Sequence, residues 1–392
     1  MNAPVGIAGR DIICLSTHYW DERWFRKQEF MARFAKSNRV LFVEPGFSMA
    51  RPPEMHLREV ATNRYVLSRL EAREQGVHLL KPPRGLPFWS HPPVERINYE
   101  WYGRVVGRAA KRLGFRDAIL WVYRPAYYHG LSAIPHRWLV LDLVDDLSAY
   151  GGGHWSHVEY EIERLVAVAD LLVVTAKTLL ERYGPAAARA VHVPNGFDAA
   201  LFSPETAGAE QPSLLAGIPR PILGFVGTLF SFVDFDLLEQ VARVHEDKSI
   251  VLVGPVETSV RPAVVRLRKL PNVLHIERQP QSAIPGFIAS FDVCLNPFRR
   301  GRVADSVSPL KVYEYLAMGR PVVSVPMKAL EMEDVARAIL FADGPSEFSH
   351  RVQECLEAGD HDAKRRRDLV APHSWQRLFE RLDIACAEAL SA

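Results

Sequence analysis

A helix-like segment in the second half of the chain combines residues that could bind a phosphate. In the stretch SVSPLKVYEYLAMGRPVV (306–323), Ser308 is a favourable N-cap and Pro309 fits the first helical position. The unpaired N–H groups of such a first turn carry partial positive charge, to which Lys311 adds a full charge. Glu314 is three residues further along the same face and could accept hydrogen bonds from the two hydroxyls of a ribose.

The loop before this helix is rich in arginine. Arg299, Arg300 and Arg302 could bind a diphosphate together with the first helical turn, which contains Leu310. The alternative is a capped surface helix with a solvated Lys–Glu pair, preceded by a solvated basic loop. Gly319 suits the left-handed residue at which such a helix ends.

Two adjacent carboxylates follow an apolar run in the first half of the chain. Asp145 and Asp146 come directly after the predicted strand 138–144, and α/β sheets bind ligands at the carboxyl ends of their strands. A carboxylate there could take the proton of an acceptor hydroxyl or stabilise a cationic sugar centre. The alternative is an aspartate that caps the next turn. Asp142 is expected to point into the sheet, so no metal site is predicted.

The segment LSTHYWDERWFRKQEF (15–30) joins the first predicted strand to the first predicted helix. It places aromatic and hydrogen-bonding side chains where a sugar or an acceptor could bind, namely His18, Trp20, Arg26 and Gln28, and His18 is also a candidate catalytic residue. For His18, a capping or packing role is the alternative. The segment contains no G-x-G-x-x-G, so the dinucleotide-binding fingerprint is absent.

A glycine turn follows another predicted strand in GFVGTLF (224–230). Gly227 would let the backbone approach a ligand closely, and Thr228 could add a backbone N–H or a hydroxyl. The alternative is a tight turn that needs glycine for its own geometry.

The segment 81–115 is basic and carries aromatic residues. Its seven basic and two acidic residues give a net charge of +5, and its aromatic residues include Phe88, Trp89, Trp101 and Tyr102. An anionic membrane surface or a lipid-diphosphate acceptor would attract such a segment. The alternative is a basic helix whose aromatic side chains are in the core.

Regular elements must position these candidates, and short apolar runs alternate with helical patterns along most of the chain. Near-continuous apolar strands joined by helices indicate parallel sheets covered on both faces, so the predicted fold class is α/β. Strands are predicted at 11–16, 39–45, 118–123, 138–144, 171–176, 190–195, 221–227, 249–254, 273–277, 292–297, 321–326 and 338–342.

The chain of 392 residues is too long for one ordinary core. A segment rich in Pro, Ala, Gly and Ser (199–221) separates the two series of strands, as an interdomain linker would. We therefore predict two doubly wound, Rossmann-like domains that face a cleft. The predicted parts are a first domain at 1–200, a linker at 201–220, a second domain at 221–372, and a C-terminal helix at 373–392 that could pack back on the first domain.

Composition and targeting signals narrow the functional classes. A net charge of +2 does not require a nucleic-acid partner, and four cysteines without CxxC spacing are typical of reduced thiols in a cytoplasmic protein. The N-terminus lacks a basic segment followed by a long apolar run, and no stretch reaches eighteen apolar residues. We expect a cytoplasmic protein that could associate peripherally with the inner face of the membrane.

Four motifs resemble those of one known family. SPLKVYEYLAMGRPVV, VADLLVVTAKTLLERYG, VPNGFDAALF and GFVGTL look like motifs of GT-B glycosyltransferases of the family 4 type, in particular bacterial cell-surface polysaccharide transferases of the teichuronic-acid type. The resemblance implies the GT-B architecture and a nucleotide diphosphate sugar as donor, held mainly by the second domain. It also implies retention of anomeric configuration, with no cofactor and no required metal.

The resemblance assigns roles to residues of the second domain. Glu314 matches the second acid of the family's E-x7-E pair, which binds the ribose, and Lys311 would lie near the donor phosphates. Gly227 matches the glycine of the first turn in the donor domain. Gln279 and Pro280 follow a strand at the place where related enzymes contact the base.

In the first domain, Asp145 or Asp146 falls where relatives place a catalytic acidic residue or histidine. The sequence also departs from the family pattern. Ser306 stands at the position of the first acid of the pair, with Asp305 beside it, and GTLFSFVDFD lacks the usual Arg and Lys after the glycine turn. Sugar recognition and phosphate neutralisation must therefore differ in detail.

Together these observations predict a glycosyltransferase of polysaccharide biosynthesis that transfers a sugar to a cell-surface glycan, a lipid-linked acceptor or a small molecule. Two alternatives remain, a nucleotide-sugar epimerase or hydrolase on the same fold and a non-catalytic subunit that binds sugar nucleotides. The predicted partners are the donor, the acceptor and an anionic membrane surface at 81–115, without nucleic acid.

Overall fold

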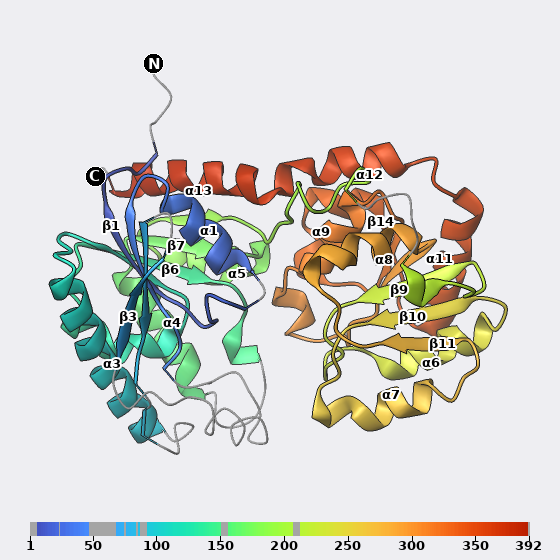
Figure 1. The fold of residues 1–392 in the computed structure, drawn as a ribbon, viewed down its shortest axis with the longest axis horizontal. Helices are drawn as coiled ribbons and strands as arrows, with labels where there is room; N and C mark the ends of the chain where they lie inside the picture. The colour runs from blue at the N-terminus through green and yellow to red at the C-terminus, as the bar shows by residue number, and fades with distance from the viewer. Residues whose placement is uncertain are drawn as a thin grey trace. The chain divides into compact units, whose positions relative to one another are not determined.

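The computed structural model describes residues 6–22, 24–46, 68–73, 76–83, 85–86, 92–149, 156–206 and 212–390. The chain divides into two compact units, of which the first comprises Met1–Val193 and Phe379–Ala392 and the second Pro194–Leu378. Each unit is an α/β structure built on its own sheet (Figure 1).

The first unit contains an eight-stranded sheet in the order β3-β4-β2-β1-β5-β6-β7-β8. Neighbouring strands are parallel except for β3, which is antiparallel to β4. The strands β1 and β5 are buried along their whole length, as expected for a sheet covered on both faces. The strands are β1 (Asp11–Leu15), β2 (Arg39–Val43), β3 (Arg69–Ala72), β4 (Val77–Lys81), β5 (Ile119–Val122), β6 (Trp138–Leu143), β7 (Leu171–Val174) and β8 (Ala190–His192).

Helices connect these strands and cover the sheet. They are α1 (Arg26–Phe34), α3 (Pro92–Arg112), the 3-10 helix η2 (Pro125–Ala133), α4 (Ser156–Val168) and α5 (Lys177–Tyr183). Helix α13 (Trp375–Leu390) begins in the second unit, and its residues from Phe379 onward belong to the first.

The second unit contains a six-stranded parallel sheet in the order β11-β10-β9-β12-β13-β14. The strands are β9 (Ile222–Val226), β10 (Ser249–Val253), β11 (Val273–Ile276), β12 (Val293–Asn296), β13 (Val322–Ser324) and β14 (Ile339–Phe341). The helices are α6 (Phe235–Val244), α7 (Arg261–Leu267), α8 (Ile284–Ser290), α9 (Leu310–Ala317), α10 (Lys328–Glu331), α11 (Pro345–Ala358) and α12 (Ala363–Val370).

The predicted fold class is confirmed, and each of the twelve predicted strands overlaps one in the structure. Strands β3 and β4 were not predicted. The sequence of β3, RLEA, is polar and partly exposed because this strand lies at the edge of the sheet. Gly319 ends α9 with a φ of 73°, the left-handed conformation predicted for it.

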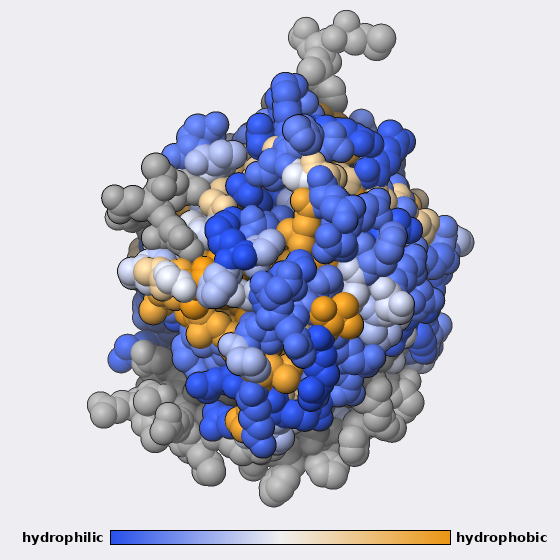
Figure 2. Space-filling view, turned by 90° about the vertical axis from the view of Figure 1, so that its right-hand side faces the viewer, coloured by the Kyte–Doolittle hydropathy of each residue, from blue (hydrophilic) through white to orange (hydrophobic). Residues whose placement is uncertain are grey.

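The surface seen in Figure 2 is mainly hydrophilic, with apolar residues in small groups. Within the ranges that the structure describes, no helix combines the length and apolar character needed to cross a bilayer.

Candidate functional site

The second sheet reverses its winding direction between β9 and β12. Strand β9, the first in this unit, pairs with β10 on one side and β12 on the other. Doubly wound sheets bind their ligands at such a point, outside the carboxyl ends of the strands. The turn after β9 contains Gly227, and the loop after β12 leads into α9. The two predicted donor motifs therefore meet at this edge of the sheet.

Helix α9 is held against β9 by Tyr315. The Tyr315 hydroxyl accepts a hydrogen bond from the backbone N–H of Val226 at 2.7 Å. Burial raises the pKa of this hydroxyl well above its usual range, so it stays protonated. Tyr315 follows Lys311 by four residues on the same face, and this bond therefore brings the first turn of α9 to the turn at Gly227.

The start of α9 corrects one prediction. The helix begins at Leu310 after Pro309, and no side chain among the described residues caps it. The hydroxyl of Ser308 instead shares a hydrogen bond with the Tyr313 hydroxyl at 3.0 Å and accepts one from the backbone N–H of Asn195 at 3.3 Å. Ser308 is therefore not the N-cap, because its oxygen is engaged by other parts of the unit.

Lys311 lies beside Gly227 and between two aromatic rings. Its Nζ is 4.8 Å from the ring centroid of Phe225 and 4.7 Å from that of Phe298. Gly227 has a φ of 147°, and a Cβ atom on it would lie 3.1 Å from Cε of Lys311. A side chain at 227 would therefore strain the turn and displace the lysine. The two aromatic partners were missed, because their proximity to Lys311 depends on the packing of α9.

The remaining donor candidates near α9 differ in exposure. Glu314 is only 5% exposed on the second turn of the helix. Ser306, at the position of the missing acid, is also buried, and its hydroxyl donates to the carbonyl oxygen of Val303 at 3.1 Å. Arg299 and Arg302, in contrast, are exposed in the loop before the helix. Two exposed cationic side chains thus precede the first turn of α9 in the chain.

Three further donor candidates follow parallel strands of the same sheet and so share its carboxyl edge. Thr228 follows β9 and is exposed, and Pro280 is exposed after β11. Gln279 is partly buried, and its amide donates to the carbonyl oxygen of Glu277 at 3.1 Å.

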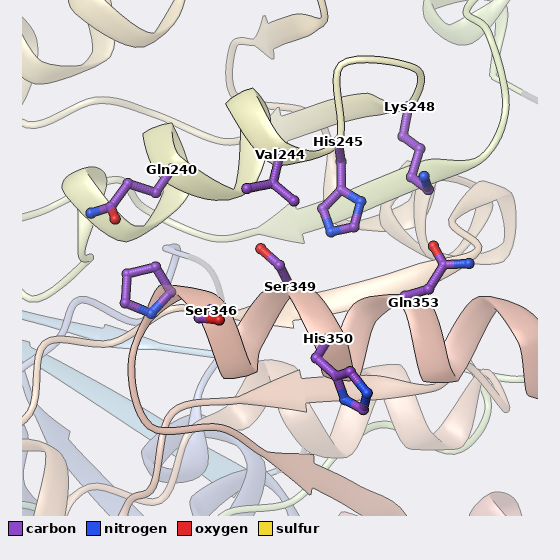
Figure 3. A pocket seen from close by; sticks show the side chains of 9 residues that line it. Gln240, Val244, His245, Lys248, Ser346, Ser349, His350 and Gln353 are labelled. Carbon is purple, nitrogen blue, oxygen red and sulfur yellow. The ribbon is translucent and has the colours of Figure 1, made fainter.

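A pocket of about 570 Å³ lies elsewhere in the second unit, between α6 and α11. Figure 3 shows Val244 and His245 facing Ser349 of α11 across it. His245 and Lys248 directly precede β10, so this pocket is at the amino end of a strand. It is therefore distinct from the donor edge defined by Gly227 and α9.

In the first unit, the structure separates the two adjacent aspartates. Asp146 is buried, and its Oδ1 accepts hydrogen bonds from the backbone N–H and the hydroxyl of Ser148 at 3.1 and 2.5 Å. Its Oδ2 forms an ion pair with Arg182. Asp146 thus orders the turn after β6, whereas Asp145 is only half-buried at the carboxyl end of that strand. Asp145 is therefore the more exposed carboxylate of the two.

The acceptor-side expectation needs correction for Arg26 and Gln28. Arg26 is 1% exposed; its Nε contacts the Asp142 carboxylate at 3.0 Å, and its Nη1 donates to the Val193 carbonyl at 2.7 Å. Gln28 is fully buried, and its amide nitrogen donates to the carbonyl oxygen of Tyr19 at 2.9 Å. Gln28 therefore ties the loop after β1 to the first turn of α1. Arg26 is drawn into the interior by partners more than a hundred residues away.

His18 and Trp20 remain partly exposed on that loop, after the carboxyl end of β1. The His18 ring is 3.0 Å from the Thr17 hydroxyl and packs against Phe25 at a centroid distance of 5.0 Å. Trp20 packs edge-on against Phe42 at 4.9 Å. Each therefore has packing partners and still presents part of its ring to solvent.

Lys27 is a residue that the sequence analysis did not single out. It is 5% exposed, and its Nζ lies 4.9 Å from the ring centroid of Tyr123. Burial lowers the pKa of Lys27 to about 8, and the charges of Asp142 and Asp145 partly oppose this shift. A buried cation thus lies within electrostatic range of the candidate carboxylate Asp145.

The lowered pKa of Lys27 predicts how the stability of the chain changes with pH, and this can be tested. Between pH 8 and 10.5 the unfolded chain binds the Lys27 proton more tightly than the folded chain does. The contribution of Lys27 to stability therefore rises with pH over this range and is lowest below pH 8. Relative to Lys27→Met, the wild type should gain on the order of 2–3 kcal/mol of unfolding free energy from pH 7 to pH 10. Urea unfolding of both chains at the two pH values measures this, and a difference that does not change with pH would contradict it.

Comparison with known proteins agrees with this geometry. Residues 220–358 match the family model described as glycosyl transferases group 1. TuaH of Bacillus subtilis (strain 168), which is named as a teichuronic acid biosynthesis glycosyltransferase, is 26% identical over 227 residues. That match covers 56% of this chain and 57% of TuaH, so the similarity spans little more than half of either protein.

Solved glycosyltransferase structures share the fold over nearly the whole chain. Sucrose-phosphate synthase from Thermosynechococcus elongatus superposes with a TM-score of 0.72 at 14% identity, covering 98% of this chain and 99% of that chain. Anabaena Alr3699/HepE, solved in complex with UDP, gives a TM-score of 0.64 at 16% identity, covering 98% and 100%. The chain therefore has the GT-B glycosyltransferase fold. The similarity to the glycosyl transferases group 1 model lies within the second unit.

Proposed function

We propose that the chain is a glycosyltransferase whose second unit binds a nucleotide diphosphate sugar. The observation that carries the proposal is the meeting of Lys311, the glycine turn at Gly227 and the first turn of α9 at the carboxyl edge of the second sheet. As the bond between sugar and phosphate breaks, negative charge builds on the leaving diphosphate. The lysine, the helix N-terminus and nearby arginines stabilise that charge without a metal.

The first unit supplies the acceptor side of the proposed reaction. Asp145 takes the proton of the acceptor hydroxyl or stabilises the cationic sugar centre, and the transfer retains anomeric configuration. His18 and Trp20, partly exposed after β1, are proposed contacts for the acceptor. The name of TuaH supports a bacterial cell-surface glycan as the acceptor, with lipid-linked and small-molecule acceptors as further classes.

A turnover assay with and without acceptor tests this function. A panel of nucleotide sugars, with UDP-sugars first because HepE was solved with UDP, is incubated with glycan, lipid-linked and small-molecule acceptors. We expect nucleoside diphosphate release that depends on an acceptor, together with a glycosylated product. Rapid donor conversion without acceptor would instead indicate an epimerase or a hydrolase. Saturable donor binding without turnover on any acceptor would indicate a non-catalytic subunit.

We further propose that helix α3 binds an anionic membrane surface. Its exposed basic residues include Arg108 and, three or four residues from it, Arg104, Lys111 and Arg112, so they form a stripe along one side of the helix. A hollow of about 760 Å³ beside it, lined partly by Arg104 and Arg137, is large enough for a lipid headgroup. Tyr102 is buried and belongs to the core.

Arg84, Phe88 and Trp89, which the sequence analysis included in this basic segment, lie outside the described residues. The proposed membrane contact therefore rests on α3 and the hollow beside it.

Replacing Arg104, Arg108 and Lys111 together by glutamine should weaken vesicle binding by roughly 100-fold, because each basic residue near an anionic surface contributes about 1 kcal/mol. Flotation with phosphatidylglycerol-containing vesicles at low and high salt measures this. The matched control replaces Arg261, Arg268 and Lys269, which are exposed around α7, and should bind as the wild type does. Equal losses in both variants would contradict a specific role for α3.

A further inference from the structure

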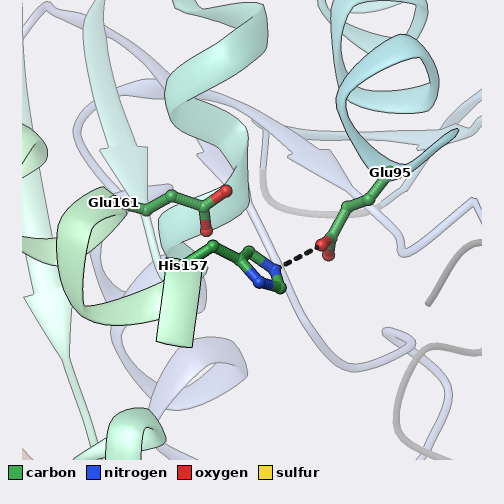
Figure 4. A group of neighbouring side chains, drawn as sticks. All are labelled: Glu95, His157 and Glu161. Carbon is green, nitrogen blue, oxygen red and sulfur yellow. Dashed lines mark hydrogen bonds and ion pairs between the residues drawn. The ribbon is translucent and has the colours of Figure 1, made fainter. Parts of the chain in front are cut away.

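Three side chains from two helices of the first unit form a cluster that the proposed transfer does not use. Glu95 is in the first turn of α3, and His157 and Glu161 are four residues apart on α4, so the latter two share one face. One ligand atom of each residue lies within 4.8 Å of the other two. Figure 4 shows the His157 ring between the two carboxylates, and its Nε2 is 3.0 Å from Oε2 of Glu95.

Both carboxylates of this cluster are buried, with Glu95 7% and Glu161 3% exposed. Two negative charges this close in the interior must be compensated. Arg124 contacts Glu95 at 3.3 Å, and the His129 ring contacts Glu161 at 2.9 Å. Arg124 supplies one positive charge to these two carboxylates, and a divalent cation at the cluster would supply more.

The ligand set indicates which cation this would be. One imidazole nitrogen and two carboxylate oxygens suit a first-row divalent metal, and Zn²⁺ is bound by such sets with one position left for water. A tetrahedral zinc ion about 2.0–2.2 Å from each ligand separates the ligand atoms by roughly 3.3 Å. The ligand atoms, which now lie within 4.8 Å of one another, must therefore come closer together when the metal binds. His129 is placed to orient Glu161, as the outer partners of metal ligands commonly do.

The cysteines would not compete for this metal in the folded chain. Cys14, Cys294, Cys355 and Cys386 are all buried. Burial raises the pKa of each thiol, so the thiolate that zinc requires is disfavoured.

We propose that Glu95, His157 and Glu161 bind one Zn²⁺ ion, with water as the fourth ligand, and that this ion joins the start of α4 to α3. The metal replaces the hydrogen bond between His157 and Glu95 as the link between the two helices. The first turn of α4 also carries Glu159, which pairs with Arg182, the partner of Asp146. The ion therefore stabilises the turn after β6 and takes no part in the sugar transfer.

Titration calorimetry of the full chain with ZnCl₂, after treatment with a chelator, tests this site. We expect one equivalent to bind with a Kd of about 1 μM or tighter. His157→Ala and Glu161→Gln should bind at least about 100-fold more weakly. Glu163→Gln is the matched control, because Glu163 is exposed on the same helix, and it should bind as the wild type does.

Glu95→Gln, on the other helix, should lose zinc to the same extent, and circular dichroism establishes that each metal-free variant is folded. The proposal is overturned if the wild type takes up no zinc at about 100 μM. It is equally overturned if the folded variants bind zinc as tightly as the wild type, since the metal would then be held elsewhere on the chain.

Discussion

Replacing Lys311 by methionine is expected to weaken UDP binding by about 10- to 100-fold while the chain stays folded. A charge-assisted hydrogen bond to a phosphate contributes roughly 1.5–3 kcal/mol, which corresponds to this range. Methionine keeps an unbranched apolar stem between Phe225 and Phe298, so the packing of α9 against β9 should survive. Calorimetric titration with UDP measures the effect.

The matched control for this experiment is Lys364→Met on α12. Lys364 is highly exposed and pairs with Asp368, so its removal should leave UDP affinity unchanged. If Lys311→Met binds UDP within about threefold of the wild type while the control does the same, the lysine does not contact the diphosphate.

Replacing Asp145 by asparagine should reduce turnover by about 100- to 10,000-fold, the usual contribution of general acid–base catalysis. The amide has nearly the same size, so the change removes the charge and the basic oxygen rather than the packing. UDP affinity should not change, because the proposed donor residues are in the second unit. The rate is measured with the acceptor that the panel assay identifies, and an unchanged rate would exclude Asp145 from catalysis.

Asp146→Asn serves as the control, because we expect it to reduce stability and largely keep turnover. Both oxygens of Asp146 are engaged, by Ser148 and by Arg182. We therefore expect the free energy of unfolding to fall by about 1–3 kcal/mol, with turnover within about tenfold of the wild type. A stable Asp146→Asn variant without turnover would contradict this assignment and would indicate that Asp146 is the catalytic carboxylate.

The fold was predictable because its signals are local. Buried strands such as β1 and β9 read as continuous apolar runs, and Gly319 marks the end of α9 by its conformation. Strand β3 escaped prediction because its polar sequence lacks such a run. Its place in the sheet depends on pairing with β4, which no local pattern specifies.

The site was less predictable, because side-chain roles depend on distant partners. Arg26 looks like a ligand contact in the sequence, yet Asp142, more than a hundred residues away, draws it into the interior. Ser308 has the sequence of an N-cap, but Asn195 engages its hydroxyl. The sequence around His157 likewise gives no sign of Glu95, which reaches it from a different helix.

The positions of some site residues could be predicted because they depend on strand ends and not on distant contacts. The carboxyl end of a parallel strand is where a ligand-binding loop must lie, so the positions of Gly227 and Asp145 at strand ends could be read from the sequence. The sequence does not show which polar side chains form hydrogen bonds or ion pairs with one another. The distinction between Asp145 and Asp146 required the structure for that reason.

A crystal structure of the chain with UDP tests the central claim most directly, namely that the first turn of α9 binds the diphosphate of the donor. We predict that the diphosphate lies at the first turn of α9, within hydrogen-bond distance of Lys311 and beside Gly227, with the ribose hydroxyls on Glu314. A diphosphate bound away from α9, at another edge of the second sheet or in the pocket between α6 and α11, would contradict it.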